Sequence, residues 1–305
     1  MFKKILGKEK PDPNKRKVVV LSADHGLVGK AILPALTKRQ LLDVYAGVQN
    51  PGRFPEMEGV TVLKTDMEDK KAVYRVFSKQ KFDRLIVVVP GNRPDWAENA
   101  LEAADRCKHV KFVVCISLIV SPTDTFFGGN YNDVELATKH YFPFGHCIVR
   151  LPQLMDAITP LCSKTIKEEK SYRDPRDPTM PFRCVALEDV GKAVTQIILR
   201  PANHEKKVYH ILGPSVTMNQ QTAALSKASG KDIKLVGEDY EQYRETLTQA
   251  RVPEWSIHGT FEIYQLIDEA HEIINMEDTG DYEKLTQEKP TSLEKWCMMN
   301  KAHFK

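Results

Sequence analysis

The chain has 305 residues, of which 42% are hydrophobic and 28% are charged, and its formal net charge is +3. This length can bury a full hydrophobic core, and the composition is ordinary for a globular protein. The charge is uneven, because residues 1–17 carry seven basic and two acidic side chains while the remainder is slightly acidic. A body near neutrality gives no electrostatic reason to expect nucleic acid as a partner.

Signals of cellular location are few. The lysine-rich start, with Pro11 and Pro13, predicts a mobile basic leader over 1–17 that lacks the apolar core of a secretory signal. No apolar run approaches the length that a bilayer-spanning helix needs. The six cysteines are scattered, without a Cys-x-x-Cys pair or metal-ligand spacing. We therefore expect a cytoplasmic protein without a transmembrane segment or a bound metal.

Residues 18–36 predict a buried strand, a tight glycine turn and a helix. The run 18–21 is continuously apolar, which is typical of a parallel strand buried on both faces. Gly26 would let the backbone approach a pyrophosphate, and Gly29 would let the helix pack closely on the strand. Free amide groups at the helix N-terminus favour phosphates. Ala23 stands where the usual first glycine would be, so this stretch alone leaves cofactor binding open.

The next segments alternate between strand and helix patterns. Pro34 falls inside the first helix, where we expect a local kink rather than an end. Further strands are expected at 42–48, 60–64, 85–89, 111–117 and 146–151, with helices from 68, at 95–106 and at 132–142. This alternation predicts an α/β fold with a Rossmann-type, doubly wound parallel sheet.

The rest of the chain predicts a smaller, mainly helical region. The proline-rich stretch 171–181 is expected to be an irregular loop. Strands are expected at 182–186, 208–212 and 233–236, and helices capped at 188–189, from Thr217 to Ser229, across 239–275 and capped by Thr291. We predict a dinucleotide-binding core at 18–155, and a substrate or lid region at 156–305 that is interleaved with the end of the sheet.

The order of these elements resembles a known family. The segments that carry the likeness are 23–29, 65–67, 111–117, 147–152, 186–191 and 209–214. Together they resemble NmrA-like members of the atypical short-chain dehydrogenase/reductases. In the C-terminal third, 209–214, the helix after Thr217, 250–254 and 289–296 are similar to the ergot-alkaloid reductase branch, the festuclavine and agroclavine dehydrogenases.

The resemblance implies a nicotinamide cofactor, NADP or NAD, lying across the strand ends. It places the pyrophosphate at the first turn, the adenine after the third strand, and the ribose and nicotinamide at the ends of the fourth, fifth and sixth strands. The implied residues are Ala23, Asp24, His25, Gly26, Leu27, Val28 and Gly29 for the pyrophosphate, Asp66 and Met67 for the adenine, Pro90, Gly91 and Ser117 for the ribose and nicotinamide, and Leu151 and Pro152 beside the nicotinamide.

The chain departs from the family pattern where the 2′-phosphate of NADP would bind. Gln49 and Asn50 stand where relatives usually carry an arginine, and no acid is there to hold a free 2′-hydroxyl. Arg53 could reach the phosphate, or it could be a surface arginine. Asp24 would repel a pyrophosphate, and His25 would either offset that repulsion or remain a solvated loop residue. The choice between NAD and NADP therefore stays open.

The reaction chemistry is the larger departure. No Tyr-x-x-x-Lys occurs, and Tyr131 is followed four places later by Glu135, so no catalytic residue is assigned. Reduction of a carbonyl needs a proton donor, whereas hydride addition to an iminium needs none. Asp189 is interpreted as a helix cap rather than an acid. Trp255 and Tyr243 are interpreted as core residues rather than pocket walls, and Met298 and Met299 as packing residues.

Two functions remain. The first is an NAD(P)H-dependent reductase of a small organic molecule, an imine or iminium being one candidate. The second is a non-catalytic protein that senses dinucleotide or serves as a scaffold for a protein partner.

Overall fold

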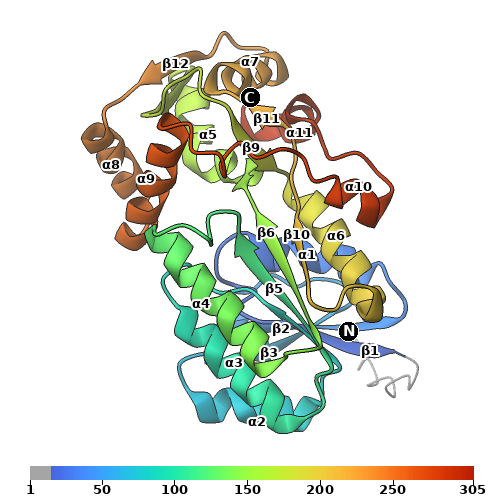
Figure 1. Cartoon of the computed structure of the whole chain (residues 1–305). Coiled ribbons are helices and arrows are strands. Elements are labelled where there is room, and N and C mark those ends of the chain that lie inside the picture. The colour runs from blue at the N-terminus through green and yellow to red at the C-terminus, as the bar shows by residue number, and fades with distance from the viewer. Residues whose placement is uncertain (1–14) are drawn as a thin grey trace.

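The computed structural model describes residues 15–305, so the expected leader over 1–17 lies outside the described residues except for its last three (Figure 1). The central element is a seven-stranded sheet in the order β10-β6-β5-β4-β1-β2-β3, and every neighbouring pair is parallel. Its strands are β1 (Arg16–Val20), β2 (Leu42–Val48), β3 (Val60–Lys64), β4 (Arg84–Val87), β5 (Phe112–Leu118), β6 (His146–Leu151) and β10 (Lys207–His210). The strand order changes direction between β1 and β4, which is where Rossmann-type folds bind their ligands.

Helices cover both faces of this sheet. Residues of β1 and Leu21, which follows it, alternate between two cores: Val18 and Val20 face one, while Val19 and Leu21 face the other, and all four are fully buried. The predicted apolar run is therefore buried on both sides, as a central parallel strand requires. The covering helices are α1 (Val28–Thr37) and α6 (Leu187–Leu199) on one face, and α2 (Lys70–Gln80), α3 (Pro94–Cys107) and α4 (Phe126–Tyr141) on the other (Figure 1).

The first helix passes through Pro34 without ending. Pro34 lies on the exposed side of α1, and the helix continues for one further turn to Thr37. On the buried side α1 packs closely on α6, because a Cβ at Gly191 would lie only 3.2 Å from the Cβ of Ala35. The prediction that the helix continues past the proline is confirmed.

The second region lies beyond the carboxyl ends of the strands, in the upper part of Figure 1, and has a hydrophobic core of its own. Its helices are α5 (Ile158–Glu168), α7 (Met218–Ser229), α8 (Tyr240–Gln249), α9 (Glu254–Asp268), α10 (Asp281–Thr286) and α11 (Leu293–Met299). Its short strands are β7 (Gln153–Leu154), β8 (Ser171–Asp174), β9 (Phe182–Val185), β11 (Ser215–Val216) and β12 (Lys234–Gly237). Single 3-10 turns lie at Pro51–Arg53, Met155–Ala157, Pro201–Asn203 and Lys301–His303.

Several predicted boundaries, in both regions, are wrong. The stretch expected to be irregular begins with a strand, because Ser171–Asp174 precedes its first proline and pairs in parallel with β12. Helix α4 starts six residues earlier than expected, where Thr125 accepts a hydrogen bond from the Gly128 amide. Residues 269–275 are turns rather than helix. Met298 and Met299, expected to pack, are 45% and 56% exposed.

Two predicted helix caps have other roles. The carboxylate of Asp189 is buried and accepts hydrogen bonds from the Tyr282 hydroxyl and from the backbone amide and hydroxyl of Thr291. Ala186 takes the cap position of α6, and Ser292, not Thr291, caps α11. The capping box of Thr217 with Gln220 and the helix stop at Gly230 are confirmed. Among residues 15–305, no helix is long and apolar enough to cross a bilayer.

Candidate functional site

The turn between β1 and α1 has the geometry that the sequence predicts for its two glycines. Gly26 adopts φ +67°, and a Cβ there would meet no atom within 4 Å, so the backbone faces open space. A Cβ at Gly29 would lie 2.8 Å from the Cα of Ala23, so only glycine lets α1 come this close to the strand end. Ala23 is fully buried, and its amide donates to the carbonyl of Gly47 on β2. The turn is thus packed against the sheet at Ala23 and Gly29 and open to solvent at Gly26.

A cleft of about 520 Å³ opens over this turn at the carboxyl edge of the sheet. Its floor is the turn and the ends of β4, β5 and β6, and its far wall is the start of α9. The predicted binding residues in its lining are Asp24, His25, Gly26, Leu27, Val28, Pro90, Gly91, Ser117 and Leu151. Four separate predicted segments, at 24–28, 90–91, 117 and 151, are therefore brought to one cleft.

The other predicted residues are absent from the lining of the cleft. Asp66 accepts from the amide of Glu68, and the buried Met67 has its carbonyl held by the Asn99 side chain at 2.8 Å. Arg53 is exposed on a 3-10 turn, and Pro152 lines a second cavity. The full set outside the lining is Ala23, Gly29, Gln49, Asn50, Arg53, Asp66, Met67 and Pro152.

Asp24 is directed toward the end of β2. One carboxylate oxygen, Oδ2, accepts from the backbone amides of Gln49 at 2.9 Å and Asn50 at 3.2 Å. The other, Oδ1, lies 3.1 Å from Nδ1 of His25, whose ring meets Trp96 edge-on at 4.9 Å. His25 is therefore held by two neighbours, and the expected alternative of a solvated loop histidine is wrong.

Beneath the cleft floor lies a buried carboxylate, Glu135, that sequence reasoning did not place. Its Oε1 accepts from the hydroxyls of Ser117 at 2.8 Å and Ser121 at 2.7 Å, and Arg150 binds both of its oxygens at 2.8 Å. Burial alone would raise the pKa of Glu135, but the Arg150 guanidinium and the two serine hydroxyls hold that pKa below its ordinary value. Because Ser117 donates its proton to Glu135, its oxygen can only accept from a ligand.

Tyr131 lines the cleft one helical turn before Glu135. Its hydroxyl donates to the carbonyl of Val89 at 3.3 Å, and burial raises its pKa to about 12. The phenol therefore stays protonated near neutrality and is a neutral donor at the wall. The neighbouring Asn130 holds the carbonyl of Gly91 at 2.7 Å. Helix α4 thus fixes residues 89–91. The strand predicted at 85–89 ends earlier, at Val87, so Val89 belongs to this loop.

Helix α9 closes the far side of the cleft. The ring of Phe127 lies between two glycines, because Cβ atoms at Gly91 and Gly259 would come within 2.5 and 2.6 Å of it. Trp255 meets Phe127 edge-on at 6.1 Å and lines the cleft, so the prediction that Trp255 is only a core residue is wrong. The interpretation of Tyr243 as core is confirmed, because it is 3% exposed within the second core.

A second cavity, of about 270 Å³, adjoins the cleft and shares Leu118, Phe127, Leu151 and Leu154 with it. Its lining is mostly aliphatic and aromatic. Its polar lining residues are Gln153, Arg183, Thr260 and Tyr264. Arg183 donates to the carbonyls of Met276 and Gly213, and no ion pair of Arg183 is found within residues 15–305. Small-molecule pockets are usually lined by apolar side chains with a few polar groups, and this cavity has that kind of lining.

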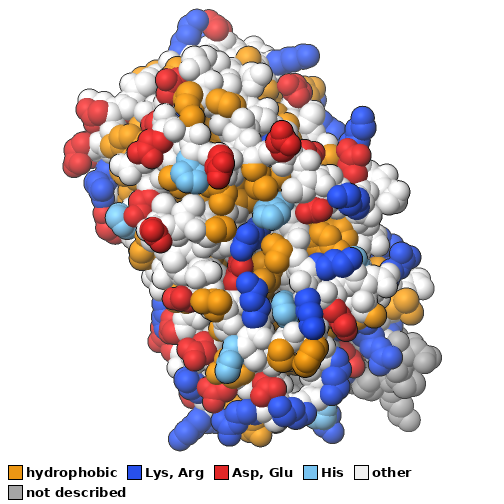
Figure 2. Space-filling view, viewed as in Figure 1, with side chains coloured by type: hydrophobic (Ala, Val, Ile, Leu, Met, Phe, Trp, Pro, Cys, Tyr) orange, Lys and Arg blue, Asp and Glu red, His pale blue; other side chains and the backbone are white. Residues whose placement is uncertain are grey.

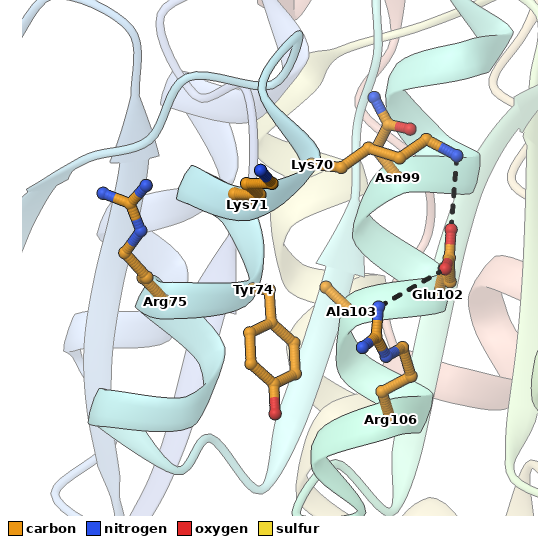
Figure 3. Close-up of a pocket in the computed structure, with 8 residues that line it drawn as sticks. All are labelled: Lys70, Lys71, Tyr74, Arg75, Asn99, Glu102, Ala103 and Arg106. Carbon is orange, nitrogen blue, oxygen red and sulfur yellow. Dashed lines mark hydrogen bonds and ion pairs between the residues drawn. The ribbon is translucent and has the colours of Figure 1, made fainter.

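A basic groove lies between α2 and α3, outside this cleft. Lys and Arg side chains gather at the lower end of the face shown in Figure 2, over the region of these helices. In Figure 3, Lys70 and Arg106 both approach Glu102, at 3.3 and 3.7 Å, and Arg106 also lies over the ring of Tyr74. The groove shares no lining residue with the cleft, so we do not assign it to the same site.

In the part of the chain that the structure describes, no group of three or more His, Cys, Asp or Glu side chains could hold a metal ion. All six cysteines are free, and burial raises the pKa of Cys115 to about 12. A buried thiol of this kind stays protonated and unreactive near neutrality.

The strand order, the open glycine turn and the cleft at the change of strand direction define a Rossmann-type α/β protein. The chain belongs to the NmrA-like family, whose model matches residues 14–297. No curated protein matches the sequence.

Three similar solved structures illustrate the range of proteins with this fold. Triphenylmethane reductase of Citrobacter sp., complexed with NADP(H), has a TM-score of 0.74 at 18% identity, covering 93% of this chain and 99% of that one. An NADPH-dependent quinone oxidoreductase of Escherichia coli, complexed with NADPH, has a TM-score of 0.74 at 20% identity, with the same coverage. NmrA, a negative transcriptional regulator in complex with NAD, has a TM-score of 0.67 at 16% identity, covering 93% and 95%. Such low identities show a shared fold and no more.

Proposed function

We propose that this protein binds a nicotinamide dinucleotide across the cleft and reduces a small organic molecule held in the adjoining cavity. The observation that carries the proposal is the open turn at Gly26, which lies in one cleft with the loop at 89–91 and the end of β5. The reductases named above bind NADP(H) or NADPH, and the NmrA regulator binds NAD. Those ligands support a cofactor of the same class here.

The residues fit such a cofactor by position. The backbone amides of 26–29 would hold the pyrophosphate, since they lie at the N-terminus of α1 and the turn is open at Gly26. Met67, with Asp66, would lie near the adenine, while Gly91, Ser117 and Leu151 would line the ribose and nicotinamide side. We propose that the remaining predicted residues hold these binding segments in place. We also propose that the chain divides into a cofactor-binding core at 18–155 and a substrate or lid region at 156–305.

The bound cofactor would supply hydride. The protein would bind the cofactor and the acceptor, orient them toward each other and exclude water from the cleft. Trp255 and Phe127 would shield the reacting end from solvent, because they close the side of the cleft at Gly91. Tyr131 offers a neutral hydroxyl in the same wall, and it would donate a hydrogen bond to an acceptor oxygen once released from Val89. A proton donor is therefore present without a Tyr-x-x-x-Lys pattern.

The cavity favours a neutral or anionic acceptor. Its lining includes the cationic Arg183, and no carboxylate is among the lining residues that the structure describes. Asp124, Glu272 and Glu277 line a separate and more open depression beside it. The iminium hypothesis rests on similarity to the ergot-alkaloid branch, and a lining without a counter-charge gives a cationic acceptor no support. We propose instead an apolar acceptor that carries a carbonyl or carboxylate oxygen.

A second candidate function is that of a dinucleotide-responsive regulator that acts through a protein partner. The basic groove between α2 and α3 favours it, because Lys70, Lys71, Arg75 and Arg106 outnumber Glu102 there and suit an acidic surface. This function would require dinucleotide binding without turnover. A cytoplasmic location remains a prediction for either function, supported by the absence of disulfides among the described residues.

One experiment separates these functions. The full chain would be melted with NADH, NADPH, NAD and NADP in turn, and a ligand at about 100 times its Kd should add about 2.7 kcal/mol to the free energy of unfolding. Loss of dihydronicotinamide absorbance would then be followed with a matched set of neutral, carboxylate-bearing and iminium acceptors. We expect oxidation with the first two, and a raised KM for the carboxylate alone in Arg183→Gln.

Each outcome has a distinct meaning. No thermal shift with any of the four nucleotides would refute the binding proposal. Binding without turnover of any acceptor would favour the regulator. Turnover of the iminium alone would restore the hypothesis drawn from the sequence and would refute the role given to Arg183.

A further inference from the structure

The carboxylate of Asp24 occupies a particular place in the fold. It arises from the turn after β1, yet it is bonded to the first two residues after β2, Gln49 and Asn50. In dinucleotide-binding folds the adenosine ribose lies against the end of β2, where an acid holds the 2′-hydroxyl of NAD or an arginine accommodates the 2′-phosphate of NADP. The chain carries neither after β2, but Asp24 brings an acid to that point from a different strand.

We propose that Asp24 makes this protein select NAD(H) over NADP(H), an inference that rests on the proposed dinucleotide site. Two independent features of Asp24 support it. The first is the occupation of hydrogen-bond donors, and the second is charge.

The donors at the end of β2 are already used. The amides of Gln49 and Asn50 both donate to Oδ2 of Asp24, at 2.9 and 3.2 Å, so neither is free to donate to a 2′-phosphate at this point. The nearby imidazole of His25 is engaged with Oδ1 at 3.1 Å. The carboxylate of Asp24 thus occupies the donors that could otherwise bind the 2′-phosphate of NADP. With three contacts, it keeps acceptor capacity for a ribose hydroxyl, which donates rather than competes.

The charge at this point also opposes a phosphate. The side chain of Asp24 is 18% exposed, so its repulsion of a dianion is only partly screened by water. The cation nearest in sequence to Gln49 and Asn50 is Arg53, which is exposed on the 3-10 turn Pro51–Arg53 and would therefore attract a phosphate weakly. Together the two effects should weaken NADPH relative to NADH by about tenfold or more.

The test measures binding rather than turnover. Calorimetric titration of the full chain would compare NADH with NADPH, and ADP-ribose with 2′-phospho-ADP-ribose, since each pair differs only in the phosphate. The parent protein should bind the unphosphorylated member of each pair about tenfold or more tightly. In Asp24→Asn the amide oxygen can still accept from Gln49, but the charge is gone, so affinity for NADPH should rise about tenfold. NADH should lose affinity.

A matched control is Asp105→Asn, which removes an exposed carboxylate on α3 that pairs with Lys108 and leaves the preference unchanged. Equal binding of both members of each pair by the parent protein would overturn the role of Asp24 and leave the proposed function intact. Binding of none of the four ligands would overturn both. If Asp24→Asn fails to fold, as judged by its melting curve, binding of the two ligand pairs to the parent protein still tests whether the site prefers NAD(H).

Discussion

Replacement of Gly26 by alanine tests the phosphate turn most directly, because the chain contains a matched control. Gly26 has φ +67°, Gly230 at the end of α7 has φ +72°, and a Cβ at either would meet no atom within 4 Å. The two substitutions therefore impose the same backbone strain in equally open surroundings. They differ in that Gly26 lines the cleft, whereas Gly230 is absent from its lining.

The expected loss of stability is the same for both variants. An L-residue in the left-handed region costs about 1 to 2 kcal/mol, and no clash adds to this. Gly26→Ala and Gly230→Ala should each lower the free energy of unfolding by about 1 kcal/mol in urea titrations followed by tryptophan fluorescence. In Gly26→Ala the new methyl group projects into the space proposed for the pyrophosphate. That variant should bind NADH about tenfold or more weakly, while Gly230→Ala should bind like the parent protein.

The comparison can refute the reasoning in two ways. If Gly26→Ala loses the expected stability but binds NADH within twofold of the parent protein, the turn does not hold the pyrophosphate. If Gly230→Ala weakens binding as much as Gly26→Ala, the loss reflects general destabilisation. The first result would place the cofactor elsewhere on the molecule, and the second would remove the evidence that the turn contacts it.

Two buried carboxylates yield further predictions. Glu135→Gln leaves Arg150 without its charge partner and should cost about 3 kcal/mol at neutral pH. Because the pKa of Glu135 is lowered in the folded state, its contribution is present above its ordinary value of 4.5 and is lost as pH falls below it, so urea titrations should find that the two proteins converge in acid. Asp189→Asn places an amide group against the Tyr282 and Thr291 donors and should cost about 2 kcal/mol, with faster limited proteolysis after α10. Lost turnover with unchanged stability would instead make Asp189 part of the chemistry.

Much of the core could be predicted because its signals are local. The run 18–21 is apolar at every position, and burial on both faces of a sheet is the reason such a run exists. The capping box at Thr217 and the stop at Gly230 are likewise set by residues within one or two turns. Errors arose where a short segment depends on a distant partner, as Ser171–Asp174 depends on β12 for its pairing.

The candidate site divides in the same way. The sequence alone determined the α/β class, the open turn at Gly26 and the absence of a Tyr-x-x-x-Lys pair, since each is a property of neighbouring residues. Only the tertiary structure decided that Asp24 faces the end of β2, 25 residues away, and that Trp255 closes the cleft. The physical reason is that the direction of a polar side chain is set by the donors the fold brings within about 3 Å, and those donors come from other strands and helices.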